Sequence, residues 1–294
     1  MNDLYPSRYI TANGLRFHYV ENGPADGPPV LLLHGFPAFW YSYRYQLGAL
    51  GQAGFRAIAP DLRGYNLSDK PLGVSSYTID KLLDDVVALV HALGYEKVTL
   101  VGHDWGGVIA WAVAASPAHR QVVERLVILN SPHPAAFIKN MTLTQLRKSW
   151  YMLLFQLPIV PEHLISRNNF SALRRILGGS ANVPGTFSAA DTDRYVEAMA
   201  RPGALTATVN YYRGMGRINP LTIPKRLVPI SAPTLLIWGE RDVALGKELT
   251  YGMSSDVPDL RIEYLPDSGH FVHEEQPEQV NRLMLDFLKP PRPC

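Results

Sequence analysis

The sequence contains almost no cysteine and no long uninterrupted apolar segment. Its single cysteine, Cys294, is the last residue, which excludes a disulfide framework and a metal site built from cysteines. No apolar run is long enough to span a bilayer, so we expect no contact with a membrane. Residues 1–8 lack the charged-then-apolar pattern of a signal peptide, and we therefore expect a cytoplasmic protein.

Neither sign of charge dominates the chain. The 28 Lys and Arg residues nearly balance the 26 Asp and Glu residues, and no basic cluster predicts a nucleic-acid partner. A hydrophobic fraction of 47% with 18% charged residues is typical of a globular protein and excludes a disordered one. With 294 residues and no internal repeat, the chain can form one large domain or a core with a modest insertion.

Short apolar segments alternate with helical periods in the first half of the chain. Polar and apolar residues alternate over 8–20, which predicts a hairpin that turns at Asn13-Gly14. Residues 30–33 are wholly apolar and predict a strand buried on both faces. This alternation predicts an α/β fold with a mostly parallel sheet and helices on both faces. Further strands are expected at 55–59, 98–101 and 126–129, and helices at 39–54 and 77–93.

From residue 133 to residue 221 the β-branched runs disappear and helical periods replace them. We interpret this stretch as a helical cap inserted into a core formed by 1–132 and 222–294. Ser188 and Asp191 resemble a capping box at the start of one cap helix. The other cap helices are expected at 143–157, 162–177 and 204–215, the later strands at 234–238 and 261–265, the closing helix at 280–288, and a tail from Pro290.

The segment Gly102-His-Asp-Trp-Gly-Gly107 joins an apolar strand to an apolar helix. Such a strand, sharp turn and helix form the nucleophile elbow of α/β hydrolases, usually written G-x-S-x-G. Here Asp104 occupies the nucleophile position. An Asp can also merely cap the following helix, but glycines at 102, 106 and 107 indicate close backbone approach on both sides. We therefore predict that Asp104 is a nucleophile.

A carboxylate nucleophile suggests displacement at saturated carbon. A serine would form an ether there, which water does not readily cleave, whereas an aspartate forms an alkyl ester that water can hydrolyse. The chemistry that fits is epoxide opening or dehalogenation. Carboxylate, imidazole and water suffice for it, so we expect no cofactor.

The acid and the base are expected at the ends of the last two strands. Asp242 follows 234–238 and His270 follows 261–265, which gives the order nucleophile, acid, histidine of the α/β-hydrolase triad. Glu240 is the competing acid. His270 would activate water, and Asp242 would orient the imidazole of His270. A metal site at His270 and His273 is not expected, because a third ligand at suitable spacing is missing.

The first central strand ends in His34-Gly-Phe-Pro37, a tight turn whose amides can face a pocket. We predict the backbone amides of Phe36 and Trp105 as donors to an oxyanion. We expect His34 and Pro37, together with Trp150 of the cap, to contact the substrate.

Together, five motifs resemble those of the epoxide hydrolases of the α/β-hydrolase superfamily, and the resemblance spans essentially the whole chain. It implies that two cap tyrosines, Tyr151 and Tyr212, hold the epoxide oxygen, with Tyr211 as the rival of Tyr212. The product would be a vicinal diol, and the partners would be a small apolar epoxide and water, with the protein a monomer or homodimer. The motifs are His34-Gly-Phe-Pro37, Asp61-Leu-Arg-Gly-Tyr-Asn-Leu-Ser-Asp69, Gly102-His-Asp-Trp-Gly-Gly107, Trp238-Gly-Glu-Arg-Asp242 and Gly269-His270.

Two other functions remain open at the level of the sequence. A haloalkane or haloacid dehalogenase would use the same Asp-His-Asp triad, with Trp105 and Trp150 as halide donors. Against it, Trp105 stands where fluoroacetate dehalogenases usually carry an Arg, and Phe36 where haloalkane dehalogenases often carry Asn or Gln. Ala38 stands where many epoxide hydrolases have a Glu. A receptor that binds ligand without turnover is the second alternative, and an intact triad argues against it.

Overall fold

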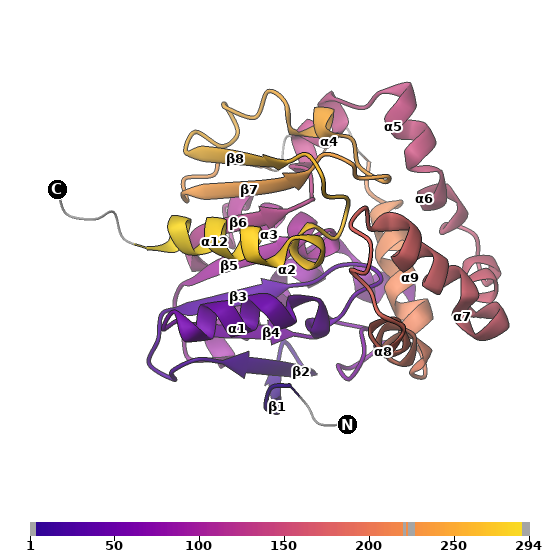
Figure 1. Ribbon diagram of the computed structural model, residues 1–294, viewed down its shortest axis with the longest axis horizontal. Helices are drawn as coiled ribbons and strands as arrows, with labels where there is room; N and C mark the ends of the chain where they lie inside the picture. The colour runs from indigo at the N-terminus through magenta and orange to yellow at the C-terminus, as the bar shows by residue number, and fades with distance from the viewer. Residues whose placement is uncertain (1–3, 220–221, 223–226, 290–294) are drawn as a thin grey trace.

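The computed structural model describes residues 4–219, 222 and 227–289, and it contains an eight-stranded sheet (Figure 1). The strand order is β1-β2-β4-β3-β5-β6-β7-β8. β2 is antiparallel to both of its neighbours, whereas all pairs from β4 to β8 are parallel. The predicted mostly parallel α/β sheet is confirmed. The strands are β1 (Ser7–Ala12), β2 (Leu15–Asn22), β3 (Pro29–Leu33), β4 (Arg56–Pro60), β5 (Val98–His103), β6 (Val123–Leu129), β7 (Thr234–Gly239) and β8 (Leu260–Leu265).

The N-terminal hairpin turns where the sequence predicts it. Asn13 and Gly14 have φ values of 48° and 73°, in the left-handed region that a two-residue hairpin loop requires. Ala12 therefore pairs with Leu15, and the alternating pattern of the two strands stays in register.

Helices cover both faces of the sheet. In Figure 1, α1 (Arg44–Gln52) and α12 (Pro277–Leu288) lie in front of the sheet and contact each other. α2 (Ile79–Ala92) and α3 (Trp105–Ala115) lie behind it. β5 lies at the centre and is buried along its whole length, as its apolar sequence requires.

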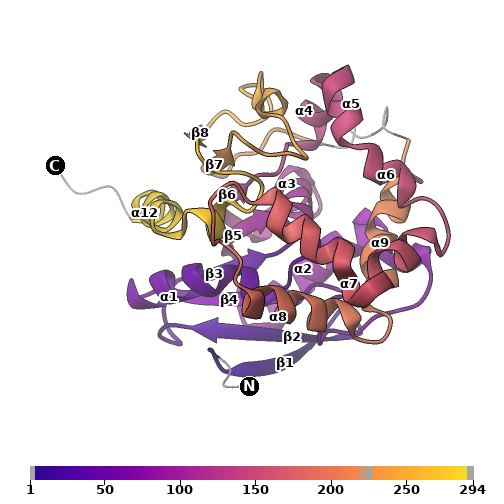
Figure 2. The same cartoon turned by 45° about the vertical axis from the view of Figure 1, so that its right-hand side comes forward.

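Between β6 and β7 the described chain is helical. Because β6 and β7 are neighbours in the sheet, this long excursion leaves the strand order undisturbed. In Figures 1 and 2 the helices of the excursion gather beyond the carboxyl ends of the parallel strands, where ligands of such sheets bind. They are α4 (Pro134–Lys139), α5 (Leu143–Lys148), α6 (Trp150–Leu154), α7 (Val160–Ser180), α8 (Ala189–Ala200) and α9 (Ala204–Met215).

Some ends of the predicted segments fall outside the described residues. These are Leu221, the last residue of the predicted cap, and the tail that starts at Pro290 and includes Cys294. Within the described ranges, no helix combines the length and apolar character that crossing a membrane requires.

Three helices are less regular than their periodicity predicts. The segment 39–54 begins as a 3₁₀ helix, Trp40–Tyr43, before α1. The segment 143–157 is broken into α5 and α6 at Ser149, whose ψ of 10° leaves the helical region. Within α7, residues 167–170 are not helical, and residues 168–170 have positive φ. Asn tolerates this conformation better than most residues, so the two asparagines at 168 and 169 explain where the helix breaks.

Other helix ends follow their local sequence closely. The capping box is confirmed, since the side chains of Ser188 and Asp191 each accept from the other residue's backbone N–H. α9 has the predicted bounds, whereas α12 begins three residues earlier than predicted, with a proline in its first turn. Additional short helices are α11 (Val272–Glu275) and the 3₁₀ turns Val74–Tyr77, Arg120–Val122 and Lys247–Thr250.

Candidate active site

Asp104 lies in a strained turn between β5 and α3. Its φ of 50° and ψ of −118° are rare for a residue with a side chain, and they lift the carboxylate away from the strand. A Cβ on Gly106 would lie 1.9 Å from the carbonyl oxygen of Leu33, and one on Gly102 would lie 2.4 Å from the carbonyl oxygen of Gly106. The glycines of the motif are therefore required by close approach of β3, β5 and α3. This geometry is a nucleophile elbow.

The carboxylate of Asp104 accepts a backbone N–H group from the turn after β3. The Phe36 amide donates to Oδ1 at 2.6 Å. A Cβ on Gly35 would lie 2.2 Å from this Oδ1 and 2.6 Å from the Trp105 nitrogen, so the turn after β3 packs directly against Asp104 and the start of α3. On the other side, Ser131 Oγ donates to the Asp104 carbonyl at 2.8 Å and steadies the turn.

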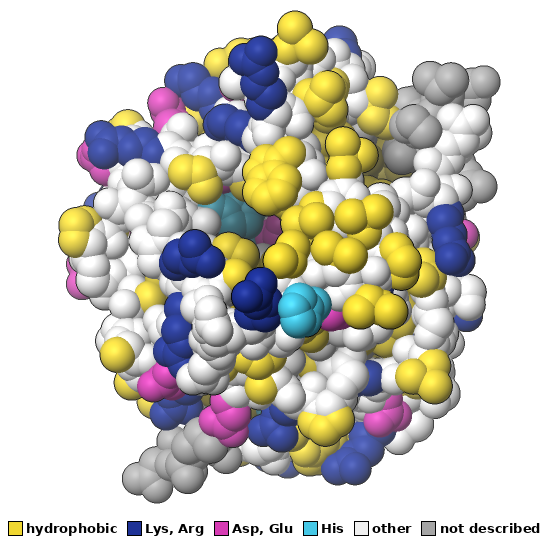
Figure 3. Space-filling view, turned by 90° about the vertical axis from the view of Figure 1, so that its right-hand side faces the viewer, with side chains coloured by type: hydrophobic (Ala, Val, Ile, Leu, Met, Phe, Trp, Pro, Cys, Tyr) yellow, Lys and Arg dark blue, Asp and Glu magenta, His cyan; other side chains and the backbone are white. Residues whose placement is uncertain are grey.

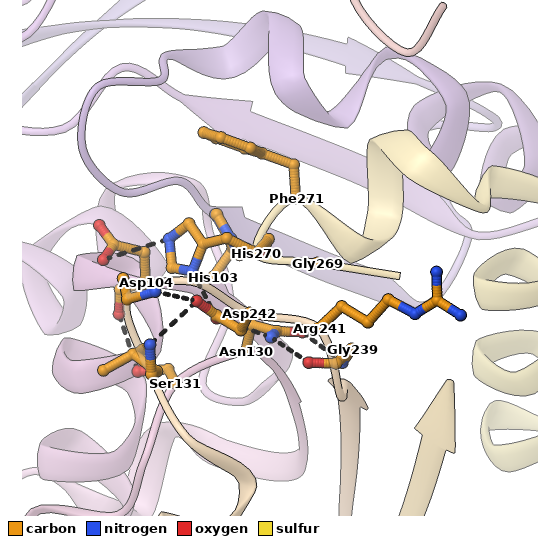
Figure 4. A network of polar contacts seen from close by, with 12 residues as sticks. His103, Asp104, Asn130, Ser131, Gly239, Arg241, Asp242, Gly269, His270 and Phe271 are labelled. Atoms are coloured by element: carbon orange, nitrogen blue, oxygen red, sulfur yellow. Dashed lines mark hydrogen bonds and ion pairs between the residues drawn. The ribbon is translucent and has the colours of Figure 1, made fainter. Parts of the chain in front are cut away.

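His270 and Asp242 lie next to Asp104 (Figure 4). His270 Nδ1 is 2.7 Å from Asp242 Oδ2, and His270 Nε2 is 3.7 Å from Asp104 Oδ2. The second distance is longer than a hydrogen bond, so Nε2 faces the Asp104 carboxylate without a tight contact. The imidazole is therefore held from one side by Asp242 and faces Asp104 with the other.

Asp242 is buried, and both of its carboxylate oxygens accept hydrogen bonds. Its Oδ1 accepts the backbone N–H groups of Ala244 and Leu245 at 2.8 and 2.9 Å. Its Oδ2 accepts the Asn130 amide at 2.9 Å in addition to His270. Burial alone would raise the pKa of Asp242, but His270 and these donors hold it below its ordinary value. By contrast, the rival acid Glu240 forms an ion pair with Lys247 at 3.0 Å.

The two carboxylates control the charge of His270. Burial alone would lower the pKa of the imidazole, but Asp242 and Asp104 outweigh it and raise the pKa to about 10. While Asp104 is ionised, His270 is therefore cationic at neutral pH. Neutralising Asp104 would remove one of the two charges that keep the proton on His270.

A cavity of about 460 Å³ opens above Asp104. Figure 3 looks onto this side of the molecule and shows hydrophobic side chains around a hollow, with a histidine and an acidic side chain at its bottom. The walls come from the elbow, the loop after β6, helices α4, α6 and α9, and Leu245. The lining residues are Asp104, Trp105, Val108, Ser131, Pro132, Pro134, Phe137, Ile138, Tyr151, Met152, Leu153, Gln156, Tyr212, Met215, Gly216, Ile218 and Leu245.

Two tyrosines face this cavity from the helical excursion. Tyr151 of α6 and Tyr212 of α9 both line it, and their rings are 5.9 Å apart, edge to face. Burial and the nearby Asp104 raise the pKa of both hydroxyls well above the ordinary value, so both keep their protons at neutral pH. Tyr211 points elsewhere, because its hydroxyl donates to the Arg63 carbonyl at 2.7 Å.

The three residues predicted to contact the substrate are not among those that line the cavity. Trp150 is 61% exposed, because α6 turns Tyr151 rather than Trp150 inward. His34 is fully buried, where its Nε2 accepts the Leu62 amide at 3.0 Å and burial lowers its pKa to about 4. Pro37 lines a separate small hollow, which Tyr65 also lines. The substrate-binding roles of these three residues are therefore not supported by the geometry.

Two other histidines, His103 and His133, are buried and pack against neighbouring groups of the protein. His103 Nε2 is 2.8 Å from the His270 carbonyl oxygen, and burial lowers the pKa of His103 to about 4. His133 packs edge to face on Trp111. Within the described ranges, no group of three or more His, Cys, Asp or Glu side chains is placed to hold a metal ion.

Asn130 and Ser131 were missed in the sequence. Asn130 has a positive φ of 39°, donates to Asp242, and accepts the Gly239 amide at 2.8 Å. Ser131 contacts the elbow and lines the cavity. The sequence signal that could have identified them is their place directly after β6, which lies beside β5 in the sheet. The carboxyl ends of these strands lie at the same edge of the sheet, where the site is formed.

Comparison with known proteins agrees with this geometry. Residues 28–277 match the family model of the alpha/beta hydrolase fold. Epoxide hydrolase 3 of Xenopus tropicalis is 40% identical over 284 residues, covering 94% of this chain and 76% of that protein. A Bacillus subtilis protein described as an AB hydrolase superfamily protein is 38% identical, covering 96% of this chain and 97% of that protein. A mutant of a Bacillus megaterium epoxide hydrolase, complexed with its product (R)-3-[1]naphthyloxy-propane-1,2-diol, superposes with a TM-score of 0.85 at 33% identity, covering 96% of this chain and 99% of that chain.

The sheet, the elbow and the family match together define an α/β hydrolase. Within that class, the chain belongs to the epoxide hydrolase family, to whose members it is similar over nearly its whole length.

Proposed function

We propose that the protein hydrolyses epoxides to vicinal diols through an alkyl ester on Asp104. One arrangement carries the proposal: Asp104 faces the His270–Asp242 pair on one side and shares an apolar cavity with Tyr151 and Tyr212 on the other. Similarity to epoxide hydrolases supports it. The helical segment 133–221 would act as the cap that closes this cavity over the core formed by 1–132 and 222–294.

In the first step, Asp104 attacks a ring carbon and the carbon–oxygen bond of the epoxide breaks. The departing oxygen takes a proton from the hydroxyl of Tyr151 or Tyr212, both of which are protonated at neutral pH. An alkoxide would be a poor leaving group in an apolar cavity, so this proton transfer lowers the barrier. The products of the step are the ester and a free hydroxyl on the neighbouring carbon.

Forming the ester also prepares the base. Esterification removes the negative charge of Asp104, one of the causes that raise the pKa of His270. The proton that His270 then releases replaces the one that the tyrosine gave to the epoxide oxygen. The imidazole becomes neutral only after the intermediate exists, which is when a base is needed.

In the second step, neutral His270 takes a proton from water and the hydroxide attacks the ester carbon of Asp104. The Phe36 amide, already 2.6 Å from Oδ1, and the Trp105 amide beside it would stabilise the oxyanion. The ester bond to the diol oxygen breaks, that oxygen takes the remaining proton of the attacking hydroxide from the Asp104 carboxyl group, and ionised Asp104 and cationic His270 are restored. Asp242 orients the imidazole and stabilises its charge in both states.

The substrate would be largely apolar. The cavity walls are dominated by Met, Leu, Ile, Phe, Pro and Trp side chains, and the related Bacillus megaterium structure holds an aryloxy diol. We therefore propose aryl and alkyl epoxides as the substrate class. The cytoplasmic location and the monomeric or homodimeric state stay predictions.

A turnover assay of the purified protein tests the proposal. Styrene oxide and an aliphatic epoxide would be compared with a bromoalkane and fluoroacetate, following diol and free halide. We expect diol without halide. Replacing Tyr151 and Tyr212 together by Phe should lower epoxide turnover by about 10²-fold or more, because no acid then protonates the leaving oxygen.

The matched control is Tyr211→Phe. Tyr211 neighbours Tyr212 in the sequence, but its hydroxyl donates to the Arg63 carbonyl, so epoxide turnover should stay within a few-fold. Release of halide without diol would contradict the proposal and would show that the cavity serves a dehalogenase.

A further inference from the structure

Glu275 lies five residues after His270 and is almost completely buried, although it belongs to no step of the proposed reaction. We propose that Glu275 is a positioning residue that fixes the His270 loop and ties it to the linker between α7 and α8. This inference rests on the proposed function, because it assigns Glu275 to the ester-hydrolysis step of that reaction.

The carboxylate of Glu275 holds the backbone on both sides of His270. Its Oε2 accepts the Gly269 amide at 2.9 Å, and its Oε1 accepts the Phe271 amide at 3.1 Å. These are the residues directly before and after the histidine. Since both amides are fixed by one buried carboxylate, the direction in which the imidazole leaves the backbone is fixed as well.

The same carboxylate reaches the linker that follows α7. Oε2 also accepts the backbone amides of Asn182 at 2.8 Å and Val183 at 3.3 Å. The Asn182 side chain donates to the Arg241 carbonyl at 2.9 Å, next to Asp242 in the chain. The linker therefore contacts the loops that carry both members of the His270–Asp242 pair.

Close packing leaves this junction little freedom. A Cβ on Gly269 would lie 2.7 Å from the Ser180 carbonyl oxygen and 3.1 Å from Glu275 Oε1. The His270 loop thus rests directly on the end of α7. Because the carboxylate of Glu275 accepts from both segments, it holds the His270 loop and the linker in one fixed arrangement.

The position of His270 matters most in the second step. Ring opening uses Asp104 and the tyrosines, whereas ester hydrolysis requires Nε2 to reach a water beside the Asp104 carbon. Glu275→Gln keeps the size of the side chain but replaces one acceptor oxygen with an NH₂ group, which would face backbone N–H donors. At least one amide of the junction then loses its acceptor.

The test is a single-turnover experiment with styrene oxide that follows the mass of the intact protein. For Glu275→Gln we expect ester formation within about twofold of the wild type and ester decay slower by about tenfold to 100-fold, the scale at which misplacement by about 1 Å slows catalysis. The adduct should therefore accumulate. The matched control is Glu278→Gln, an exposed glutamate on α12, which should leave both rates unchanged.

Equal slowing of both steps, or an unchanged decay rate, would overturn the positioning role. If Glu275→Gln does not fold, Asn182→Ala serves instead: it removes only the contact with the Arg241 carbonyl and should slow decay by a smaller factor without slowing formation. An unchanged decay rate in that variant would equally count against the inference. Failure of the proposed function is distinct, because the wild type itself would then form neither adduct nor diol.

Discussion

At the scale of the residue, the proposed chemistry depends on Asp104. Its backbone has the strained conformation of an elbow, and its Oδ1 already accepts an amide in the direction from which an oxyanion would be stabilised. An aspartate that only capped α3 would direct its side chain to the N–H groups of that helix, yet no such side-chain hydrogen bond is present. The strain is therefore explained by access to the cavity rather than by helix capping.

His270→Gln separates the two steps of the proposed reaction. Gln fills the space of the imidazole but is not a base, so we expect Asp104 to be alkylated and the ester to persist. Incubation with styrene oxide should raise the mass of the protein by one substrate, and multiple turnover should fall by about 10²-fold to 10⁴-fold. His163→Gln, an exposed histidine on α7, is the control and should behave as wild type. Normal turnover of His270→Gln would refute the assigned base.

The sequence predicts a residue well where its motif is local and follows a strand end. The elbow, Asp242 and His270 each stand in such a motif, and the structure brings their side chains together. Trp150 and Asn130 show what the sequence could not predict. Which face of the five-residue helix α6 turns inward depends on α9, and Asn130 meets Asp242 only because β6 and β7 are neighbours.

At the scale of the element, the β5–turn–α3 unit requires glycine at its points of close approach. Gly106→Ala would place a methyl group 1.9 Å from the Leu33 carbonyl oxygen. This oxygen belongs to a buried central strand, so any shift that makes room for the methyl group would lower the stability of the fold. We expect a loss of several kcal/mol of stability, or no soluble protein at all, since overpacking against backbone forces shifts of both elements.

Thermal unfolding of purified variants measures this effect. Gly178→Ala is the matched control: Gly178 lies within α7, a Cβ there would meet open space, and Ala favours helix over Gly by about 1 kcal/mol. The control should therefore be as stable as the wild type or slightly more stable. A Gly106→Ala protein with wild-type melting temperature would show that α3 can move away from β3.

Periodicity predicts which elements exist better than it predicts their interruptions. The strands and α9 follow from patterns carried by every residue of the segment. The breaks in α7 and between α5 and α6 depend on a few residues, and the apolar period continues across them. The asparagines at 168 and 169 tolerate the positive φ of the break in α7, but such tolerance permits a break without requiring one.

At the scale of the whole molecule, buried polar contacts hold α8 to the core. Arg44 of α1 forms a buried ion pair with Glu274 of α11 and lies 3.7 Å from Asp191 of α8. Tyr195 of α8 donates to Glu274 at 2.5 Å, and Tyr41 donates to Asp191 at 2.7 Å. Because Glu274 stands beside Glu275, the contacts of Glu274 with Arg44 and Tyr195 and those of Glu275 with the linker after α7 converge on α11.

The pH dependence of stability reports the charge of His270 in the folded protein. Its pKa is raised from 6.5 to about 10 by Asp242 and Asp104 against the effect of burial, so folding favours the protonated imidazole. For a raised pKa the stabilisation is complete below the unfolded pKa and is lost as the pH rises through the folded one. We therefore expect this contribution to the free energy of unfolding to be present below pH 6.5 and to disappear by about pH 10.

Comparison of the wild type with His270→Gln isolates this contribution, because other groups that titrate in the same range are shared. Each unit of pKa difference corresponds to about 1.4 kcal/mol, so the advantage of the wild type should shrink by a few kcal/mol over this window. Urea unfolding at several pH values measures it. A difference that stays constant from pH 6.5 to pH 10 would mean that the two carboxylates do not hold a proton on His270. The order of events proposed above, in which esterification of Asp104 releases the base, would then lose its physical cause.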